Sequence, residues 1–435
     1  MHSKFAAGRP GNISKVGEGV ESTYDLTSDP TGKFNGNELK YLSEALNSAN
    51  PDNKKKPWNL RFESAFSKFI GSQYCIAHNS GTSALHSCMA AAGVGPDDEV
   101  IMPALTVIMD AYAAIHLGGI PVFAEVDPDT QNIDPEDVKR KITKKTKAII
   151  TVSLQGLPAD VAPIMQIAQD RRIIVVEDCA QTMAGRYDCT VKCPGCTERC
   201  RGKHSGTIGH LGAFSFESKK HLSTGEGGMV VTDDPLLAEK VRKFGGIGYR
   251  MLRPDNSAVL LDREVFQSPN YERFDSLGLN YRMPEFIAAI GLAQLERVHE
   301  LVERRRKVAS YFAEAVKNCS WMVPQSTPIG FENSYYTFSV KYLGEDKFGL
   351  QWKDFWRMYR DRDGDGFYGA CRVPYLEPVF QKLAIPGRAY GPGLCPVAES
   401  IQKRIMQFKT NYRDLSVAHR KAEILVKLID DLGRK

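Results

Sequence analysis

The feature that most constrains the fold is an alternation of short apolar runs and helical segments that begins at Phe62. Apolar runs of this length suit strands buried on both faces, whereas the segments between them repeat apolar residues with the period of a helix. We expect strands at 74–77, 99–102, 121–125, 148–152 and 173–177, and helices at 83–92, 107–116, 135–142 and 161–171. This order predicts an α/β fold with a mostly parallel sheet and helices on both faces.

The second half of the chain changes character. We expect two more strands at 212–216 and 228–232 and a helix at 235–244, then an irregular polar stretch, a helical segment at 283–318, a strand at 335–342 and a closing helix at 417–432. The interpretation is an N-terminal arm (1–35), a large domain (36–295) and a smaller α+β C-terminal domain (296–435).

Composition excludes some classes of function. A net charge of +5 on 435 residues is too small for a nucleic-acid-binding surface. No run approaches the roughly 18 apolar residues of a membrane helix, and the N-terminus lacks the apolar core of a signal peptide. We therefore expect a cytoplasmic protein that binds neither nucleic acid nor membrane.

Two turns carry residues suited to a phosphate. Residues 79–83 (Asn-Ser-Gly-Thr-Ser) stand between an expected strand and its helix, where Gly81 lets the backbone approach a ligand. The free N–H groups and positive dipole end of a helix N-terminus bind phosphate. Residues 278–283 open the long helical segment in a similar way. Each pattern alone is more often an ordinary helix start.

A buried strand near residue 175 ends in two carboxylates, Glu177 and Asp178, and Gln181 follows. Chemistry in an open parallel sheet gathers at the carboxyl ends of its strands. A carboxylate there suits a metal, a ribose hydroxyl or the ring nitrogen of pyridoxal phosphate (PLP), which an acidic partner keeps protonated. A solvated strand end is the other interpretation.

A lysine follows the expected strand 212–216. Lys220 precedes a glycine-rich turn at 225–228, and Lys219 stands beside it. A buried lysine loses its charge easily, and only the neutral amine forms an imine with a carbonyl. A pair of surface lysines before a turn is the alternative.

In order and spacing, these motifs resemble the sugar-aminotransferase family of the DegT/StrS type, which has the PLP-dependent transferase fold type I, also called the aspartate-aminotransferase fold. The resemblance covers residues 35–435. In that family, Ser-Phe, three variable residues, Lys and then Gly-Glu-Gly-Gly mark the lysine that binds PLP as a Schiff base. Lys220 stands five residues after Ser215 and five before Gly225. The resemblance therefore implies that Lys220, not Lys219, holds the cofactor.

The resemblance also implies roles for other residues. Asp178 would pair with the pyridine nitrogen and Gln181 would lie beside the ring. The cofactor phosphate would be held by Gly81, Thr82 and Ser215. Asn280 would reach the phosphate from a partner subunit, which implies a homodimer with shared active sites.

The activity implied is a PLP-dependent transamination. Glutamate or glutamine would donate the amino group, and the acceptor would be a keto-sugar, usually nucleotide-linked, or a keto-cyclitol. One alternative is a sugar 3-dehydratase, a branch that replaces the lysine by histidine, and His221 next to Lys220 makes a register shift of one residue relevant. Another is a non-catalytic regulator that binds PLP or a metal.

The chain departs from the family pattern in two places. Val107 stands where the family supplies an aromatic residue to stack on the cofactor ring. An insert of twelve residues, 189–200, interrupts a stretch that the family runs straight through, and it holds four cysteines with Pro-Gly between the middle pair: Cys189, Cys193, Cys196 and Cys200. Four close thiolates suit a structural zinc ion. Reduced thiols, a disulfide or an iron–sulfur cluster are the alternatives.

Overall fold

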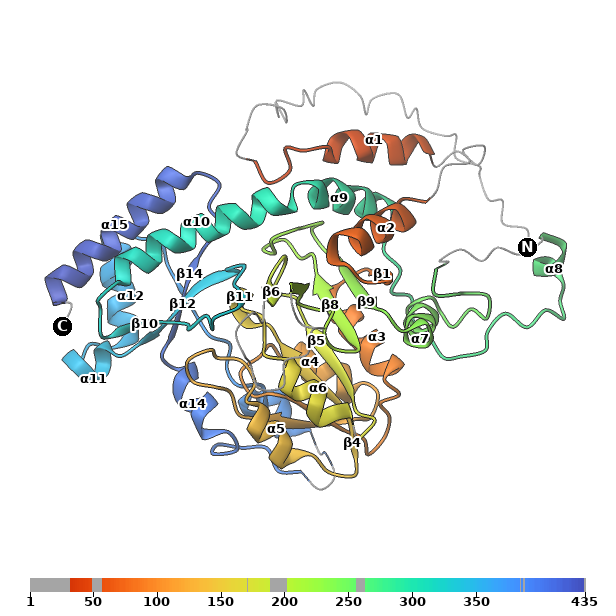
Figure 1. The fold of residues 1–435 in the computed structure, drawn as a ribbon, viewed down its shortest axis with the longest axis horizontal. Helices are drawn as coiled ribbons and strands as arrows, with labels where there is room; N and C mark the ends of the chain where they lie inside the picture. Colours follow the sequence, from red (N-terminus) through yellow and green to blue (C-terminus); the bar gives the residue numbers. More distant parts are fainter. Residues whose placement is uncertain are drawn as a thin grey trace, which may run out of the picture.

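The computed structural model describes residues 32–48, 57–169, 171–187, 202–255, 263–383, 385 and 388–433. Figure 1 shows a large domain around a twisted sheet and a smaller C-terminal part joined to it by α10 (Val298–Val316). The two parts match the large α/β unit and the smaller C-terminal α+β unit expected from the sequence.

The large sheet has seven strands. Their order is β1-β9-β8-β5-β4-β2-β3, and only β9 runs against the others. The strands are, in chain order, β1 (Tyr74–His78), β2 (Glu99–Pro103), β3 (Ile120–Ala124), β4 (Thr146–Val152), β5 (Ile174–Asp178), β8 (Leu211–Ser215) and β9 (Gly228–Thr232). The predicted mostly parallel sheet is confirmed.

Helices cover both faces of this sheet because alternate strand residues point to opposite sides. One face packs against α3 (Gly81–Ala91), α4 (Met109–Ile115) and α7 (Pro235–Gly245). The opposite face packs against α2 (Trp58–Ile70), α5 (Pro135–Lys141), α6 (Ala162–Gln169) and α9 (Glu285–Glu296). The sheet is thus buried on both sides, as its continuous apolar runs predict.

The long helical segment expected at 283–318 is in fact two helices, so the prediction of one element was wrong. Helix α9 ends at Glu296 and α10 starts at Val298, with Arg297 at a non-helical φ of −109° and ψ of 6° between them. Helix α9 packs closely in the large domain, where a Cβ on Gly291 would lie 2.7 Å from the Phe62 ring. The first turns of α10 pack in the same core through Val298 and Val302, whereas its later turns pack in the core of the C-terminal part, so α10 links the two domains.

The C-terminal part is built on a four-stranded antiparallel sheet in the order β10-β12-β14-β13. Its strands are β10 (Met322–Pro324), β12 (Thr337–Tyr342), β13 (Tyr368–Gly369) and β14 (Ile405–Lys409). This sheet shares its core with α10, α12 (Trp352–Asp361) and α15 (Leu415–Leu432). Of these elements, the sequence analysis anticipated β12, α15 and, within the segment 283–318, α10.

One segment of the C-terminal part returns to the large domain. Between β13 and β14, the rings of Tyr375, Phe380 and Tyr390 surround Phe123 of β3 at centroid distances of 5.0, 5.6 and 5.9 Å. Helix α14 (Pro396–Gln402) lies beside α5 in Figure 1. Because both ends of this segment join the small sheet, the residues that follow β13 are held between the two domains.

The remaining elements are short. Three two-residue strands form a separate sheet: β6 (Arg186–Tyr187), β7 (Lys203–His204) and β11 (Phe331–Glu332). The other helices are α1 (Glu38–Ser48), α8 (Arg263–Gln267), α11 (Gly344–Phe348), α13 (Pro378–Lys382) and single 3-10 turns at Leu154–Gly156 and Pro374–Leu376. Across all the residues that the structure describes, no helix is long and apolar enough to cross a membrane.

Candidate active site

The turn before α3 and the end of β8 meet closely. A Cβ placed on Gly81 would lie 2.6 Å from the Ser215 Cβ, and a Cβ on Gly228 would lie 2.3 Å from the Ser80 carbonyl oxygen. Ser80 caps α3, because its hydroxyl accepts a hydrogen bond from the Ser83 N–H. The structure therefore brings Gly81 and Ser215 together at the N-terminus of an eleven-residue helix, a position suited to an anion. Thr82 lies on the exposed side of the same turn.

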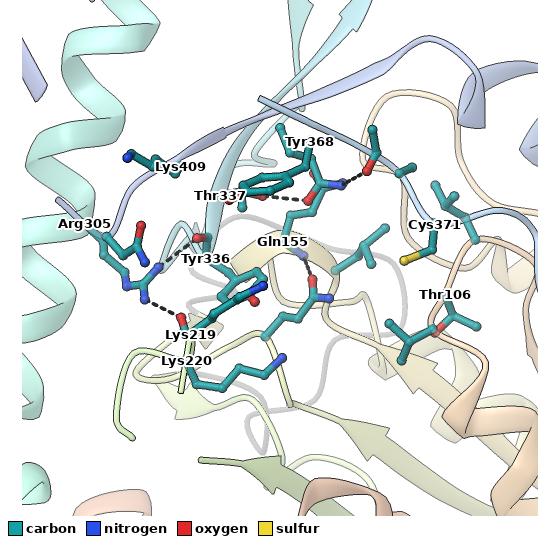
Figure 2. A pocket seen from close by; sticks show the side chains of 18 residues that line it. Thr106, Gln155, Lys219, Lys220, Arg305, Tyr336, Thr337, Tyr368, Cys371 and Lys409 are labelled. Carbon is teal, nitrogen blue, oxygen red and sulfur yellow. Dashed lines mark hydrogen bonds between the residues drawn. The ribbon is translucent and has the colours of Figure 1, made fainter. Parts of the chain in front are cut away.

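Lys220 lies just past β8 and extends into a cavity between the two domains (Figure 2). Its Nζ is 4.7 Å from the centroid of the Tyr336 ring. Burial lowers the pKa of Lys220 below its usual value, whereas Asp178 and Glu217 partly oppose that shift. Lys219 also borders the cavity, but it is an exposed residue. The geometry thus gives Lys220 the environment in which an amine is most readily neutral.

Asp178 ends β5 and is 2% exposed. One oxygen, Oδ1, accepts a hydrogen bond from the Ala180 N–H at 2.8 Å. Burial raises the pKa of this carboxyl, while the Ala180 N–H and the positive charge of Lys220 act to lower it. The anion therefore has one direct donor and one nearby cation, a setting that suits pairing with a protonated ring nitrogen.

Gln181 borders the same cavity and is held in place by the backbone. Its Oε1 accepts a hydrogen bond from the Gln155 N–H at 2.7 Å. Gln155 has a φ of 59°, a left-handed conformation that is uncommon for a residue with a side chain. Strain of this kind persists where the surroundings enforce it, frequently at functional sites. Sequence analysis found Gln181 but not Gln155.

The cavity has a volume of about 580 Å³. The charged side chains that line it are all cations: Lys219, Lys220, Arg305 and Lys409. Uncharged polar side chains of the C-terminal part also line it: Tyr336, Thr337, Tyr368, Cys371, Gln407 and Asn411. Among the residues that the structure describes, the cavity lining carries cations and no carboxylate, which favours a ligand with negative charge.

Arg305 borders the same cavity, and the sequence analysis did not single it out. It lies on α10, and its guanidinium donates to the carbonyl oxygens of Lys219 (2.7 Å) and Tyr336 (2.9 Å) and to the Thr410 hydroxyl (3.2 Å). Burial lowers the pKa of Arg305 to about 10. Arg305 therefore ties the lysine-bearing loop to the small domain. It is one of three consecutive arginines in the chain, so no local signal distinguishes it.

His221 does not line the cavity. It is buried, and its Nε2 lies 2.9 Å from the Ser334 carbonyl oxygen. Val107 does line the cavity, with an aliphatic side chain where the family resemblance leads one to expect an aromatic ring. The aromatic ring facing Lys220 is that of Tyr336, which the sequence analysis did not single out.

Asn280 is exposed and lies beside the phosphate-suited turn of its own chain. Its carbonyl oxygen accepts from the Asn79 side chain at 3.4 Å, and its Oδ1 accepts from Arg282 Nε at 3.0 Å. Asn79 is two residues from Gly81, so these contacts bring the two turns predicted from sequence close together.

The four cysteines of the insert, Cys189, Cys193, Cys196 and Cys200, lie outside the residues that the structure describes. Elsewhere in the chain, within the described ranges, no group of three or more His, Cys, Asp or Glu side chains is arranged to hold a metal ion. The zinc site thus stays a prediction.

Comparison with known proteins shows a match to a protein family. The model of the DegT/DnrJ/EryC1/StrS aminotransferase family matches residues 33–416. The chain is 36% identical over 283 residues to a GDP-perosamine synthase of Caulobacter vibrioides. The aligned residues cover 65% of this chain and 68% of that protein. The chain is also 34% identical over 306 residues to the L-glutamine:2-deoxy-scyllo-inosose aminotransferase of Micromonospora echinospora, with 69% and 68% covered.

A solved structure agrees with the fold. The aminotransferase from Psychrobacter cryohalolentis superimposes with a TM-score of 0.74 at 28% identity, covering 91% of this chain and 96% of that one. The likeness extends over both domains, because such coverage spans the large sheet and most of the C-terminal part.

Proposed function

Because the chain belongs to the DegT/DnrJ/EryC1/StrS aminotransferase family, we propose that its sugar substrate is linked to a nucleotide and that its amino donor is glutamate or glutamine. Members of this family are PLP-dependent enzymes, and the relatives of this chain transfer an amino group to keto-sugars or related ketones. The observation that carries the proposal is the cavity beside Lys220, whose charged lining residues are all cations.

The residues present fit PLP. The Gly81 turn has no room for a side chain next to Ser215, which leaves backbone N–H groups for the phosphate. Asp178 is buried and Lys220 is half-buried. The charge of each side chain shifts the pKa of the other, so the two groups lie in one region. The cofactor, when bound, supplies an electron sink for the bond changes at the donor's α-carbon.

Each of the residues around the cofactor would have its own role in the reaction. Lys220 would bind the cofactor covalently and, when released, move a proton at the donor's α-carbon. Asp178 would keep the ring nitrogen protonated, and Gln181 would orient the ring. Gly81, Thr82 and Ser215 would hold the phosphate. These assignments follow the family pattern, and the closeness of the residues supports them.

The two proposed substrates carry negative charges in addition to those of the cofactor phosphate. The donor brings carboxylates and a nucleotide-linked sugar brings a diphosphate, whereas a free cyclitol brings none. Lys219 and Lys409 border the cavity on the side of the small domain, and Arg305, whose guanidinium binds backbone carbonyls, adds positive charge there. Hydrogen bonds from such groups to an anion each contribute about 1.5–3 kcal/mol. This favours a nucleotide-linked acceptor over a keto-cyclitol.

The test is a comparison of matched acceptors. With ¹⁵N-labelled glutamate or glutamine, we expect ¹⁵N in the product of a nucleotide-linked keto-sugar, with kcat/KM about 10- to 100-fold above that of the same sugar without its nucleotide. Equal values for the two sugars, or transfer to a keto-cyclitol alone, would argue against a nucleotide-linked substrate. Loss of a sugar hydroxyl without ¹⁵N incorporation would indicate the dehydratase instead. A bound cofactor whose absorbance no amino donor changes would indicate a regulator.

We also propose that the working unit is a homodimer with shared active sites. Large apolar side chains near Asn280 are exposed in the single chain, and Leu277 is 92% exposed. The others in this region are Phe274, Leu279 and Phe286. Water contact with such side chains is unfavourable, and a second copy of the chain would remove it. Asn280 stands among them, which supports a contact with the partner's phosphate site.

The division into an arm (1–35), a large domain (36–295) and a small domain (296–435) remains part of the proposal. The break at Arg297 supports the boundary between the last two.

Zinc binding by the insert is a separate proposal that rests on cysteine spacing alone. Protein purified without a metal-affinity tag is expected to contain about one zinc ion per chain, in a structural role. A variant with all four cysteines changed to serine should contain none. Metal-free wild-type protein with four titratable thiols in this insert would overturn the proposal.

A further inference from the structure

A second buried carboxylate, Asp110, is near enough to Asp178 for the charge of Asp178 to raise its pKa. It lies in the first turn of α4 and is 0% exposed. The Thr106 hydroxyl donates a hydrogen bond to its Oδ2, and Thr106 itself lines the active-site cavity. Its other oxygen, Oδ1, has no hydrogen-bond partner among the residues described. Ionising a carboxyl group is unfavourable in free energy when one of its oxygens is shielded from water and accepts no hydrogen bond.

The surroundings of the pair contain little positive charge. Burial raises the pKa of the Cys88 and Cys179 thiols, and Asp178 contributes to both shifts, so the thiols stay neutral at physiological pH. Lys220 is the cation that interacts with Asp178. Two neighbouring carboxylates in such a place do not both ionise readily, because their charges repel each other and neither is solvated.

The two carboxylates differ in what stabilises an anion. Asp178 has the Ala180 N–H and Lys220, whereas Asp110 has the Thr106 hydroxyl alone. Burial and then the charge of Asp178 raise the pKa of Asp110 well above its usual value, and Thr106 only partly opposes this. The environments therefore push the two groups toward different protonation states.

We propose that Asp110 keeps its proton at neutral pH, so that Asp178 alone carries the negative charge of the pair. Asp110 is then a positioning residue: in its neutral form it does not oppose the charge of Asp178, which would face the cofactor's ring nitrogen. An ionised Asp110 would repel Asp178 and favour protonation of Asp178 itself. The functional part of this inference rests on the proposed role of Asp178.

Infrared difference spectroscopy of the purified holoenzyme tests the assignment directly. At neutral pH, the difference between wild type and Asp110→Asn is expected to contain the C=O stretch of a protonated carboxylic acid, which shifts in D₂O. The difference between wild type and Asp178→Asn should contain carboxylate bands instead. The reverse pattern, or no carboxylic-acid band for Asp110→Asn, would overturn the proposal.

Thr106→Val keeps Asp110 and removes only its hydrogen bond, so it serves if Asp110→Asn does not fold. In this variant the carboxylic-acid band should move rather than vanish. An unmoved spectrum in that region would contradict the assignment. If the band behaves as expected but Asp178→Asn retains full activity, the proposed role of Asp178 fails while the protonation of Asp110 stands.

A second readout is the pH dependence of unfolding. Asp110 ionises near its ordinary value of about 3.9 in the unfolded chain but keeps its proton in the folded one. Above that pH the folded state binds the extra proton, so this group makes stability fall as pH rises. Asp110→Asn should therefore lose less stability than wild type between about pH 5 and 8. Parallel pH profiles would count against the proposal.

Discussion

Replacing Lys220 with alanine is expected to abolish amino transfer while the fold survives. The side chain is a half-buried amine that extends into the cavity and interacts with the charge of Asp178, and its loss removes both the proposed covalent attachment point and the proposed proton carrier. General acid–base catalysis by one side chain contributes about 10²- to 10⁴-fold, so the fall in kcat should be at least of that order. The assay is steady-state amino transfer with excess cofactor.

Lys219→Ala is the matched control. The contacts of Lys219 with Glu217 and Arg305 are made by its backbone N–H and carbonyl, which alanine keeps. This variant should retain covalent cofactor and far more of kcat than Lys220→Ala, although a change in substrate KM is consistent with its place at the cavity rim. Borohydride reduction followed by peptide mapping identifies the modified lysine. A cofactor label on Lys219 would overturn the assignment.

Mixing two inactive variants should restore activity if the sites are shared. Asn280→Asp places a negative charge against the cofactor phosphate and is expected to inactivate the enzyme at limiting cofactor. A heterodimer of this subunit with Lys220→Ala contains one site that has both Lys220 and Asn280 intact. With random pairing of equal amounts, about a quarter of the wild-type activity should return.

The outcome discriminates between two geometries. If Asn280 served the site of its own chain, where its carbonyl oxygen contacts Asn79, every site in the mixture would lack one residue. The mixture would then stay inactive although the subunits exchange, which differently tagged chains would verify by co-purification. A monomeric enzyme with full activity would exclude the shared site altogether.

The sequence predicted much of the large domain correctly because its signals are local. The apolar runs that became β2, β4 and β5 are long enough to require burial, and their alternation with helices leaves few topologies. The Ser215-to-Lys220 spacing belongs to a single strand and turn, so it can be read without knowing the rest of the fold. The turn at Gly81 is of the same kind.

The small domain was less predictable. Strands β10 and β13 have three and two residues, too few for a period to emerge, and they exist because they pair with β12 and β14. The return of Tyr375 and Phe380 to Phe123 joins residues more than 250 positions apart. The break at Arg297 coincides with no proline or glycine, and Val298 and Val302 beyond it still pack in the large-domain core, so only the folded chain shows where the two cores divide.

The sequence by itself therefore determined the sheet, the family resemblance and the lysine and carboxylate proposed to serve the cofactor, since each depends on neighbours in the chain. Tertiary structure alone decided which residues join them. Arg305 from α10, Tyr336 from the small domain and Asp110 from α4 carry no local signal, and they acquire their roles from burial and from charges brought close in space. Desolvation and Coulomb interactions depend on distance in the folded chain, which sequence separation does not reveal.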